Sequence, residues 1–454
     1  MQNPLLKLAD AAAEWSGREV PAEVAHDARR AVLDWFASLL PGAVEGPAVA
    51  MARAMASARG EGRAIAYADG NLGAPRHAAL LNGVASHTAE FDDIFRDGGY
   101  HPGSPTISAA LAVAQDEGAD EDAFLRAVIG GYEVGCRVAM ALQPSHYRNW
   151  HITGTVGTIG AAVSTAMLKG GDAATIAHAI AIATSFAGGH QENLQGEGQT
   201  KPLHSGHAAD AGVLAGLAAA AGLTGSPDSL HAPHGYAAAT GEDTGNWQAA
   251  LEGLGDWTPI SRMTYKNHGC CGHIFATLDA LNVLRAEMPF AAGDVKRIEV
   301  QGYAATQSIC DRMQVNSPRD ARFSLQYCIG ALLVLGRVRM AAFTPEALAL
   351  PEIRAVMPRV TVAVDAGIAA AYPRRRMARV RVELTDGRVL ERFQQTRKGD
   401  PDDPLSDAEL AAKFDELAGA VLDPATVAPL REQILVAGDC LGALARPLAL
   451  AGRN

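Results

Sequence analysis

The stretch AEVAHDARRAVLDWFASLL, residues 22–40, is typical of an amphipathic helix that packs on a buried core. Its apolar residues recur at intervals of three and four positions: Ala28, Val32, Leu33, Phe36 and Leu39. The opposite face carries charged residues: Asp27, Arg29 and Arg30. Further along, GAAVSTAMLKG (160–170) and GVLAGLAAAAGL (212–223) are apolar nearly all round, as expected of buried helices whose small side chains permit close approach. Residues 5–265 are therefore predicted to form a compact helical core.

The pattern changes beyond about residue 293, where apolar and polar residues alternate as in half-buried strands. Three segments show this alternation: VKRIEVQGY (295–303), VTVAVD (360–365) and ARVRVELTDGRVLERF (378–393). The last of them contains Asp386-Gly387, a strong hairpin signal. Helical stretches such as ARFSLQYCIGALLVLG (321–336) lie between the strands, so this part of the chain is predicted to be α+β.

The chain returns to helix near its end, because Ser406 and Glu409 have the spacing of a capping box ahead of a helical segment. We therefore expect a mostly α protein with a large all-helical domain and a smaller α+β domain. The all-helical domain is predicted to comprise residues 1–268, completed by 404–454, and the α+β domain residues 269–403.

The composition indicates a folded globular chain that is long enough for two or three domains. It has 454 residues, of which 48% are hydrophobic and 20% charged. The 39 Lys and Arg residues against 50 Asp and Glu give a net charge of −11, which argues against a nucleic-acid partner. No signal peptide and no apolar run of about 18 residues is evident, so we expect a cytoplasmic protein without a membrane span. The six cysteines are too few and scattered for a disulfide framework.

All but His26 and His77 of the 14 histidines fall between residues 87 and 273, and four stretches of this window are candidates for chemistry. The first is HTAEFDDIFRDGGYHPGSP (87–105), in which Glu90, Asp92 and Asp93 precede His101. A carboxylate within reach of a histidine can fix its tautomer and raise its basicity, as a general acid or base requires. The alternative is an exposed helix end followed by an ordinary loop histidine.

The second and third stretches could bind an anion. In NWHITGTVGTIGAA (149–162), a helix that begins beside His151 would point N–H groups at a carboxylate, although its glycines fit tight helix packing equally well. The third stretch, GGHQENLQGEGQTKPLHSGHAADAG (188–212), is predicted to be a polar loop that carries Lys201 and His204. Lys201 precedes a proline, so we expect an extended backbone there.

The fourth stretch, YKNHGCCGH (265–273), is predicted to be a tight turn at a domain boundary that presents Lys266. Zinc is the competing interpretation, with four candidate ligands: His268, Cys270, Cys271 and His273. Structural zinc prefers cysteines separated by two to four residues, which adjacent cysteines do not satisfy. The sequence also lacks GxSxG, Walker A, HExxH and CxxC motifs, so cofactor-free acid–base chemistry is favoured.

These four stretches, followed by FSLQY (323–327), resemble the MmgE/PrpD family in the same order and over nearly the whole chain. That family includes 2-methylcitrate dehydratase, cis-aconitate decarboxylase and iminodisuccinate epimerase. The resemblance implies a large helical domain with a smaller α+β domain, a homodimer, and no metal or other cofactor.

Matched motif by motif, the resemblance implies that active-site residues converge in a cleft between the domains. The catalytic set is predicted to be His101, Glu90, Lys201, Lys266 and Tyr327. The substrate-binding set is predicted to be His151, Asp93, His204 and His268. Glu90 stands where the family commonly has aspartate, and Asp93 is the second candidate for that role.

Removing a proton next to a carboxylate builds negative charge on an anionic substrate, which cations must neutralise. Lys201, Lys266 and a protonated His151 are expected to do so, while His101, oriented by Glu90 or Asp93, moves the proton. Tyr327 is then a second acid or base.

The sequence thus predicts a hydro-lyase that acts on a small di- or tricarboxylate of the 2-methylcitrate type, with that substrate and a second copy of the chain as its partners. An epimerase of the iminodisuccinate type and a decarboxylase of a related polycarboxylate are the enzymatic alternatives. A non-catalytic binding protein and a metal-dependent enzyme are the alternatives from other classes.

Overall fold

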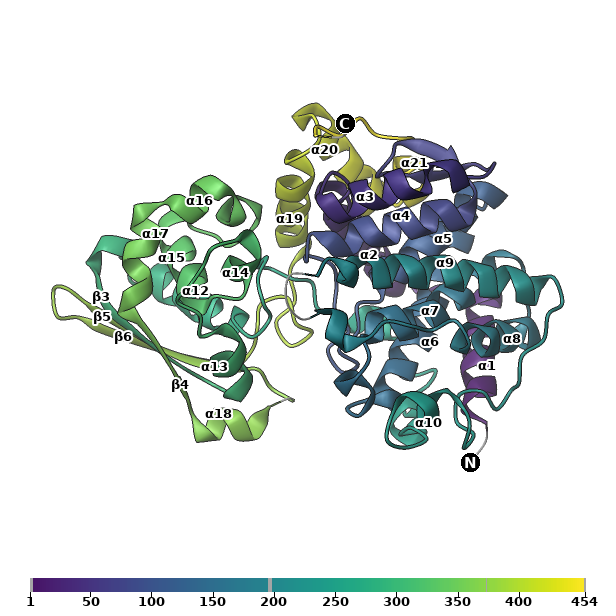
Figure 1. Cartoon of the computed structure of the whole chain (residues 1–454), viewed down its shortest axis with the longest axis horizontal. Coiled ribbons are helices and arrows are strands. Elements are labelled where there is room, and N and C mark those ends of the chain that lie inside the picture. Colours follow the sequence, from purple (N-terminus) through teal and green to yellow (C-terminus); the bar gives the residue numbers. More distant parts are fainter. Residues whose placement is uncertain (1–2, 195–197, 373, 453–454) are drawn as a thin grey trace. The chain divides into compact units, whose positions relative to one another are not determined.

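The computed structural model describes residues 3–194, 198–372 and 374–452. The chain divides into two compact units, coloured along the sequence in Figure 1. The first unit comprises Met1–Tyr265 and Ser406–Asn454, and the second comprises Lys266–Leu405. The predicted fold class, mostly helical with a smaller α+β part, is confirmed.

The first unit is built mainly from helices. They are α1 (Pro4–Gly17), α2 (Ala22–Gly42), α3 (Gly46–Met55), α4 (Pro75–Thr88), α5 (Gly103–Glu117), α6 (Glu121–Leu142), α7 (Ile152–Leu168), α8 (Ala173–Thr184), α9 (Thr200–Ala220), α10 (Tyr236–Thr240), α11 (Trp247–Leu251), α19 (Asp407–Gly419), α20 (Pro424–Glu432) and α21 (Cys440–Ala443). None of the described helices combines the length and the apolar character needed to cross a bilayer.

This unit is not all-helical as expected, because it also contains a short antiparallel pair, β1 (Ala64–Ala66) and β2 (Asn71–Gly73). The turn between the two strands contains Asp69-Gly70, and Gly70 adopts a φ of 72°, which favours glycine. Strands of three residues are too short to show a recognisable alternation of apolar and polar residues, so the sequence did not predict this hairpin.

Helices α7 and α9 pack at the centre of the first unit, and α7 is buried along almost its whole length. Glycines set their separation: a Cβ added at Gly212 would lie 2.3 Å from the Cβ of Ala161 and 2.8 Å from the carbonyl oxygen of Thr158. A Cβ at Gly157 would lie 2.6 Å from the side chain of Pro105 at the start of α5. The tight-packing interpretation of the glycines in the second stretch therefore holds.

Helix α2 confirms the amphipathic helix expected over residues 22–40, and its second half is buried on every side. Helix α19 packs against α2. Its N-terminus has the expected capping box, in which the Glu409 backbone N–H donates to the Ser406 hydroxyl oxygen at 3.3 Å. The segment that follows the second unit along the chain thus contributes to the core of the first.

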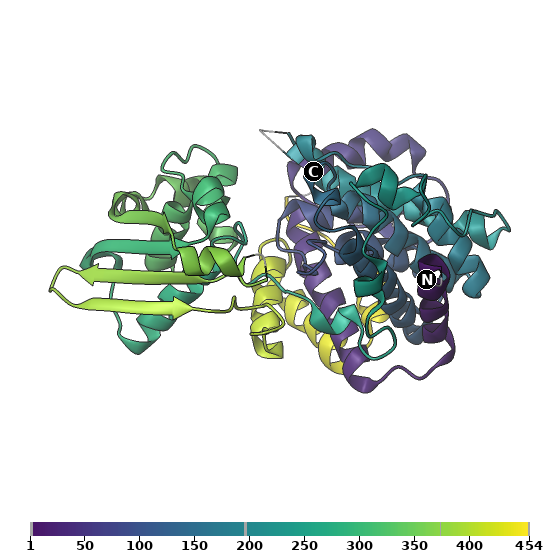
Figure 2. The same cartoon turned by 90° about the horizontal axis from the view of Figure 1, so that it is seen from below.

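The second unit contains a four-stranded sheet in the order β4-β3-β5-β6. Its strands are β3 (Val295–Gly302), β4 (Val360–Val364), β5 (Ala378–Leu384) and β6 (Val389–Gln394), all within segments predicted to be strands except for the last residue of β6. β3 pairs with β4 in parallel, whereas β3–β5 and β5–β6 are antiparallel. Figure 2 shows the β5–β6 hairpin, which turns at the predicted Asp386-Gly387.

The helices of the second unit share a core with this sheet, except for the last of them, whose Ile368 packs with Tyr303 and Met377 in a separate small cluster. They are α12 (Phe275–Glu287), α13 (Ala304–Cys310), α14 (Pro318–Arg322), α15 (Leu325–Leu335), α16 (Pro345–Ala349), α17 (Pro351–Val356) and α18 (Ala366–Ala371). Every second residue of β5 is buried, in the pattern expected of a strand with one face on a core.

The packing of α7 on α9 predicts that Gly212→Ala destabilises the protein, although alanine is normally the better helix former by about 1 kcal/mol. We expect a loss of about 1–3 kcal/mol in the free energy of unfolding, because the methyl group would overlap α7. Gly419→Ala is the matched control, since Gly419 is exposed in α19 and an added Cβ would touch nothing within 4 Å. Urea denaturation of both variants measures the free energy of unfolding. Equal stability of the two variants would contradict the prediction.

Candidate active site

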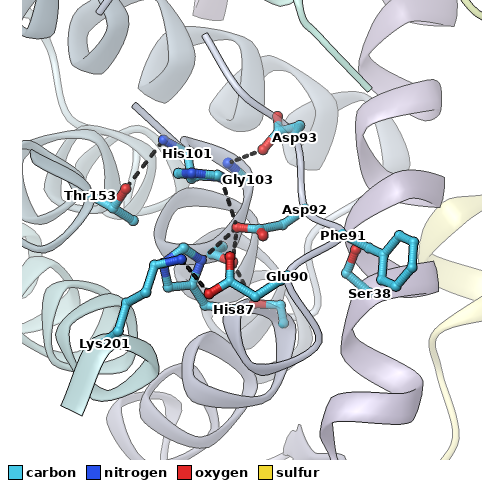
Figure 3. A network of polar contacts seen from close by, with 12 residues as sticks. Ser38, His87, Glu90, Phe91, Asp92, Asp93, His101, Gly103, Thr153 and Lys201 are labelled. Carbon is cyan, nitrogen blue, oxygen red and sulfur yellow. Dashed lines mark hydrogen bonds and ion pairs between the residues drawn. The ribbon is translucent and has the colours of Figure 1, made fainter. Parts of the chain in front are cut away.

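The loop of residues 89–93, here called the acidic loop, follows α4 and carries three of the candidate carboxylates. Glu90 has a φ of 62°, the single positive value among non-glycine residues in the described part of the chain. This left-handed conformation costs about 1–2 kcal/mol and is most often found where function requires it. Figure 3 shows the consequence: Glu90 and Asp92 extend toward Lys201 and the histidines, whereas Phe91 lies on the other side of the loop, beside Ser38.

The carboxylate of Asp92 lies between two imidazoles. Its Oδ2 atom is 2.6 Å from Nδ1 of His87 and 3.2 Å from Nδ1 of His101, and it accepts a hydrogen bond of 3.2 Å from the hydroxyl of Ser104. The side chains of His87 and Asp92 are almost completely buried, but that of His101 is 13% exposed. His101 is therefore the member of this group that a bound molecule can reach.

The structure places Asp92 against His101, whereas the sequence-based expectation gave the orienting role to Glu90 or Asp93. Asp93 turns away from His101, and its two oxygens accept hydrogen bonds from the Gly103 backbone N–H at 3.0 Å and the Tyr132 hydroxyl at 2.8 Å. Asp92 lies against His87 and His101 and Glu90 lies against Lys201 on the same side of the loop, whereas Asp93 does not (Figure 3).

Asp93 is nonetheless chemically unusual. Burial, assisted by the nearby carboxylates of Asp34 and Asp92, raises the pKa of Asp93 to about 8. The group is therefore largely protonated at neutral pH, which suits a structural hydrogen-bonding role better than that of a charged substrate ligand.

Lys201 forms an ion pair with Glu90, and both side chains keep some solvent exposure. Burial acts to lower the pKa of Lys201, but the charges of Glu90 and Asp92 outweigh it and raise that pKa, so the ammonium group stays charged. Its backbone is not extended as expected: Lys201 is the second residue of α9, because a proline such as Pro202 is tolerated in the first turn of a helix.

His151 and His204 continue the row of imidazoles that begins with His101 and His87. The His151 ring stacks on that of His87 with centroids 5.5 Å apart, and the Nδ1 atoms of His151 and His204 are 3.2 Å apart. Burial and the neighbouring imidazole and lysine groups lower the pKa of His151 well below its usual range and that of His204 to about 4. Both rings are therefore neutral near pH 7, and the protonated His151 expected from the sequence is not supported.

The remaining predicted residues lie in the second unit. Lys266 and His268 are buried, and Nε2 of His268 is 2.9 Å from Oδ1 of Asp279. Tyr327 is completely buried, its hydroxyl donates to the Ala342 carbonyl at 2.6 Å, and burial raises the pKa of Tyr327 to about 12. An acid–base role for Tyr327 requires that this hydrogen bond break. The participation of these three residues in catalysis stays a prediction.

Within the described residues, one group has the spacing to bind a metal ion: His87, Asp92 and His101, whose potential ligand atoms lie within 4.8 Å of one another. Two imidazoles and a carboxylate form a donor set that several transition metals accept. However, the 2.6 Å contact between His87 and Asp92 has the length of a charge-assisted hydrogen bond.

The alternative zinc ligands of the fourth stretch have other partners. His268 faces Asp279, and Nδ1 of His273 is 2.8 Å from the hydroxyl of Tyr303.

Sequence reasoning missed two residues of this site, His87 and the role of Asp92. Both stand in the first stretch, but the direction of Asp92 depends on the left-handed backbone at Glu90, for which a glutamate gives no sequence signal.

A helical unit that brings together a shared carboxylate, four imidazoles and a paired lysine has the groups that general acid–base chemistry requires. The profile of the MmgE/PrpD N-terminal domain matches residues 6–247, and that of the MmgE/PrpD C-terminal domain matches residues 268–437. The chain therefore belongs to the MmgE/PrpD family.

Three relatives indicate the chemistry found among similar proteins. A cis-aconitate decarboxylase-like protein of Aspergillus oryzae is 26% identical over 457 residues, which cover 95% of this chain and 94% of that protein. The cis-aconitate decarboxylase of Homo sapiens is 27% identical, with 78% of this chain and 75% of that protein covered. The Mus musculus cis-aconitate decarboxylase is likewise 27% identical, with 78% and 74% covered. These similarities agree with a lyase-type activity on a polycarboxylate.

The raised pKa of Asp93 predicts how Asp93→Asn changes stability with pH. Between the ordinary carboxyl pKa of 3.8 and about 8, the folded chain holds a proton at Asp93 that the unfolded chain has released. The wild type therefore loses this contribution to stability as the pH rises through that interval, whereas the neutral asparagine does not titrate. Urea denaturation at about pH 5.5, 7 and 8.5 should show that the free energy of unfolding of the variant increases relative to that of the wild type as the pH rises.

The control is Asp122→Asn, because the Asp122 side chain is 80% exposed. A stability difference between Asp93→Asn and the wild type that stays constant with pH would contradict the assignment of a protonated Asp93.

Proposed function

We propose that this chain is a cofactor-independent lyase that moves a proton at carbon next to a carboxylate group of a small di- or tricarboxylate. The observation that carries the proposal is the contact between His101 and Asp92, at 3.2 Å, with His101 accessible and Asp92 buried. Membership of the MmgE/PrpD family and the decarboxylase relatives support the substrate class.

Asp92 determines how His101 can act. With its Nδ1 atom facing the carboxylate, the imidazole presents Nε2 to the substrate and can accept or return a proton there. The negative charge of Asp92 stabilises the imidazolium ion that forms when His101 takes the proton. The hydrogen bond from His87 to the same carboxylate holds Asp92 in place during the transfer.

Proton removal next to a carboxylate leaves negative charge on an oxygen that must be stabilised. Lys201 supplies a positive charge within the same cluster, and a substrate carboxylate would compete with Glu90 for it. Neutral His151 and His204 contribute hydrogen bonds without charge. Lys266, with His268 and Tyr327, completes the proposed set, as the family resemblance implies.

Dehydration is the first candidate reaction: after proton removal, loss of a β-hydroxyl group as water produces the double bond. Decarboxylation is the second candidate, favoured by the names of the three relatives. There a carboxylate leaves as carbon dioxide, and the remaining carbanion takes a proton from the enzyme. Both routes use the same proton-transfer group and the same cation.

A panel of di- and tricarboxylates incubated with the purified protein in deuterated water separates these reactions. Release of water with a new ultraviolet absorbance supports the hydro-lyase, and release of carbon dioxide supports the decarboxylase. Deuterium uptake without either product indicates an epimerase and contradicts the proposal, as does binding without turnover. We expect turnover to survive a chelator; its loss would favour a metal at His87, Asp92 and His101.

His101→Ala is expected to lower kcat by about 10²–10⁴-fold on the substrate that the panel identifies, because the proton-transfer group is removed. His207→Ala is the matched control, since His207 is an exposed histidine on α9, the helix that carries Lys201. Steady-state kinetics measures both variants. Wild-type kcat in His101→Ala, or an equal loss in the two variants, would overturn the role assigned to His101.

A further inference from the structure

We infer that Lys413, on α19, is a positioning residue for the acidic loop and acts through the backbone carbonyl of Phe91. The inference rests on the proposed function, because it concerns the loop that carries Asp92. It adds a contribution from the C-terminal segment to a site whose other described groups in the first unit lie between residues 87 and 204.

The ammonium group of Lys413 connects three elements in the interior of the first unit. Its Nζ atom lies 2.5 Å from Oδ1 of Asp34 on α2 and donates to the carbonyl oxygen of Phe91 at 2.7 Å. The side chains of Lys413 and Asp34 are both completely buried. A buried ammonium ion carries a large desolvation cost, so its hydrogen-bond partners are strongly held.

Phe91 is the point at which the acidic loop can be held most effectively. It stands between Glu90, with its left-handed backbone, and Asp92, and its side chain points to the opposite side of the loop from theirs (Figure 3). Holding the Phe91 carbonyl limits rotation of the peptide group that leads into Asp92. The direction of the Asp92 carboxylate, and hence of the His101 ring, then depends on Lys413.

The charged groups around Lys413 also support a positioning role for it. Asp34 lies close enough to Asp93 to raise the pKa of that carboxyl group, and Asp92 contributes to the same effect. Lys413 places a positive charge in direct contact with Asp34, one member of this group of carboxyls. Its removal would leave Asp34 without this cation and would favour rearrangement of the loop that carries the other two.

A purely structural ion pair is the alternative explanation, and a double variant separates the two. Lys413→Met removes the positive charge and the hydrogen bond to the Phe91 carbonyl. The buried Asp34 carboxylate then lacks this cation, and the second substitution, Asp34→Asn, removes that carboxylate. If Lys413 served stability only, the double variant Asp34→Asn/Lys413→Met would recover both stability and kcat. If Lys413 positions the loop, stability recovers but kcat does not.

We expect Lys413→Met to lower kcat by about 10–100-fold with a change in KM of less than about threefold, because misplacement of a proton-transfer group affects the chemical step most. Arg137→Met is the control. Arg137 is also a completely buried cation that donates to backbone carbonyls, those of Ala250 at 2.8 Å and Trp257 at 3.1 Å. The Arg137→Met variant should be less stable than the wild type but should keep the wild-type kcat per folded molecule.

Proton NMR provides a readout that needs no substrate. The 2.6 Å hydrogen bond between His87 and Asp92 should give a downfield imidazole N–H resonance, identified by its absence from Asp92→Asn. We expect this resonance to shift or vanish in Lys413→Met and in the double variant, and to persist in Arg137→Met.

An unchanged resonance in Lys413→Met, or recovery of wild-type kcat in the double variant, would overturn the inference. Failure of the substrate panel would overturn the proposed function and leave the NMR result to decide the role of Lys413.

Discussion

The burial of the Asp92 carboxylate is the constraint on which the site in the helical unit depends. A charged group removed from water must find partners, and Asp92 finds His87, His101 and the hydroxyl of Ser104. Each partner comes from a helix end or from the loop that leads into a helix, so the carboxylate ties α4 to the segment that opens α5. The same contact that satisfies the buried charge also orients the accessible imidazole.

Close helix packing brings the other site groups to this carboxylate. His151 is the residue immediately before α7, and Lys201 and His204 lie in the first turns of α9. A Cβ at Gly154 would lie 2.9 Å from the Cβ of His204, so a larger residue there would push the two helix ends apart. The glycines that permit the packing of α7 on α9 therefore have a direct consequence for the spacing of the histidines.

Periodicity and turn chemistry predicted α2, the strands of the second unit and the Asp386-Gly387 hairpin, because each depends on residues close together in the sequence. The choice of Asp92 over Asp93 was not predicted, since it depends on the left-handed backbone at Glu90, which a glutamate does not announce. The neutral state of His151 follows from burial, which only the fold determines. Lys413 has no local signal at all, because its partner Phe91 is 322 positions away in the sequence.

Lys201 and Lys413 are each already paired with a carboxylate, and this affects how an anionic substrate can bind in the helical unit. Lys201 is paired with Glu90, Lys413 with Asp34, and His151 and His204 are neutral near pH 7. A substrate carboxylate that approaches Lys201 therefore exchanges one ion pair for another, and the net electrostatic gain is small. A substrate carboxylate can displace Glu90 only if it contacts the Lys201 ammonium group at least as well as Glu90 does. Selectivity for the substrate at this position then depends on the geometry of its carboxylate rather than on its charge.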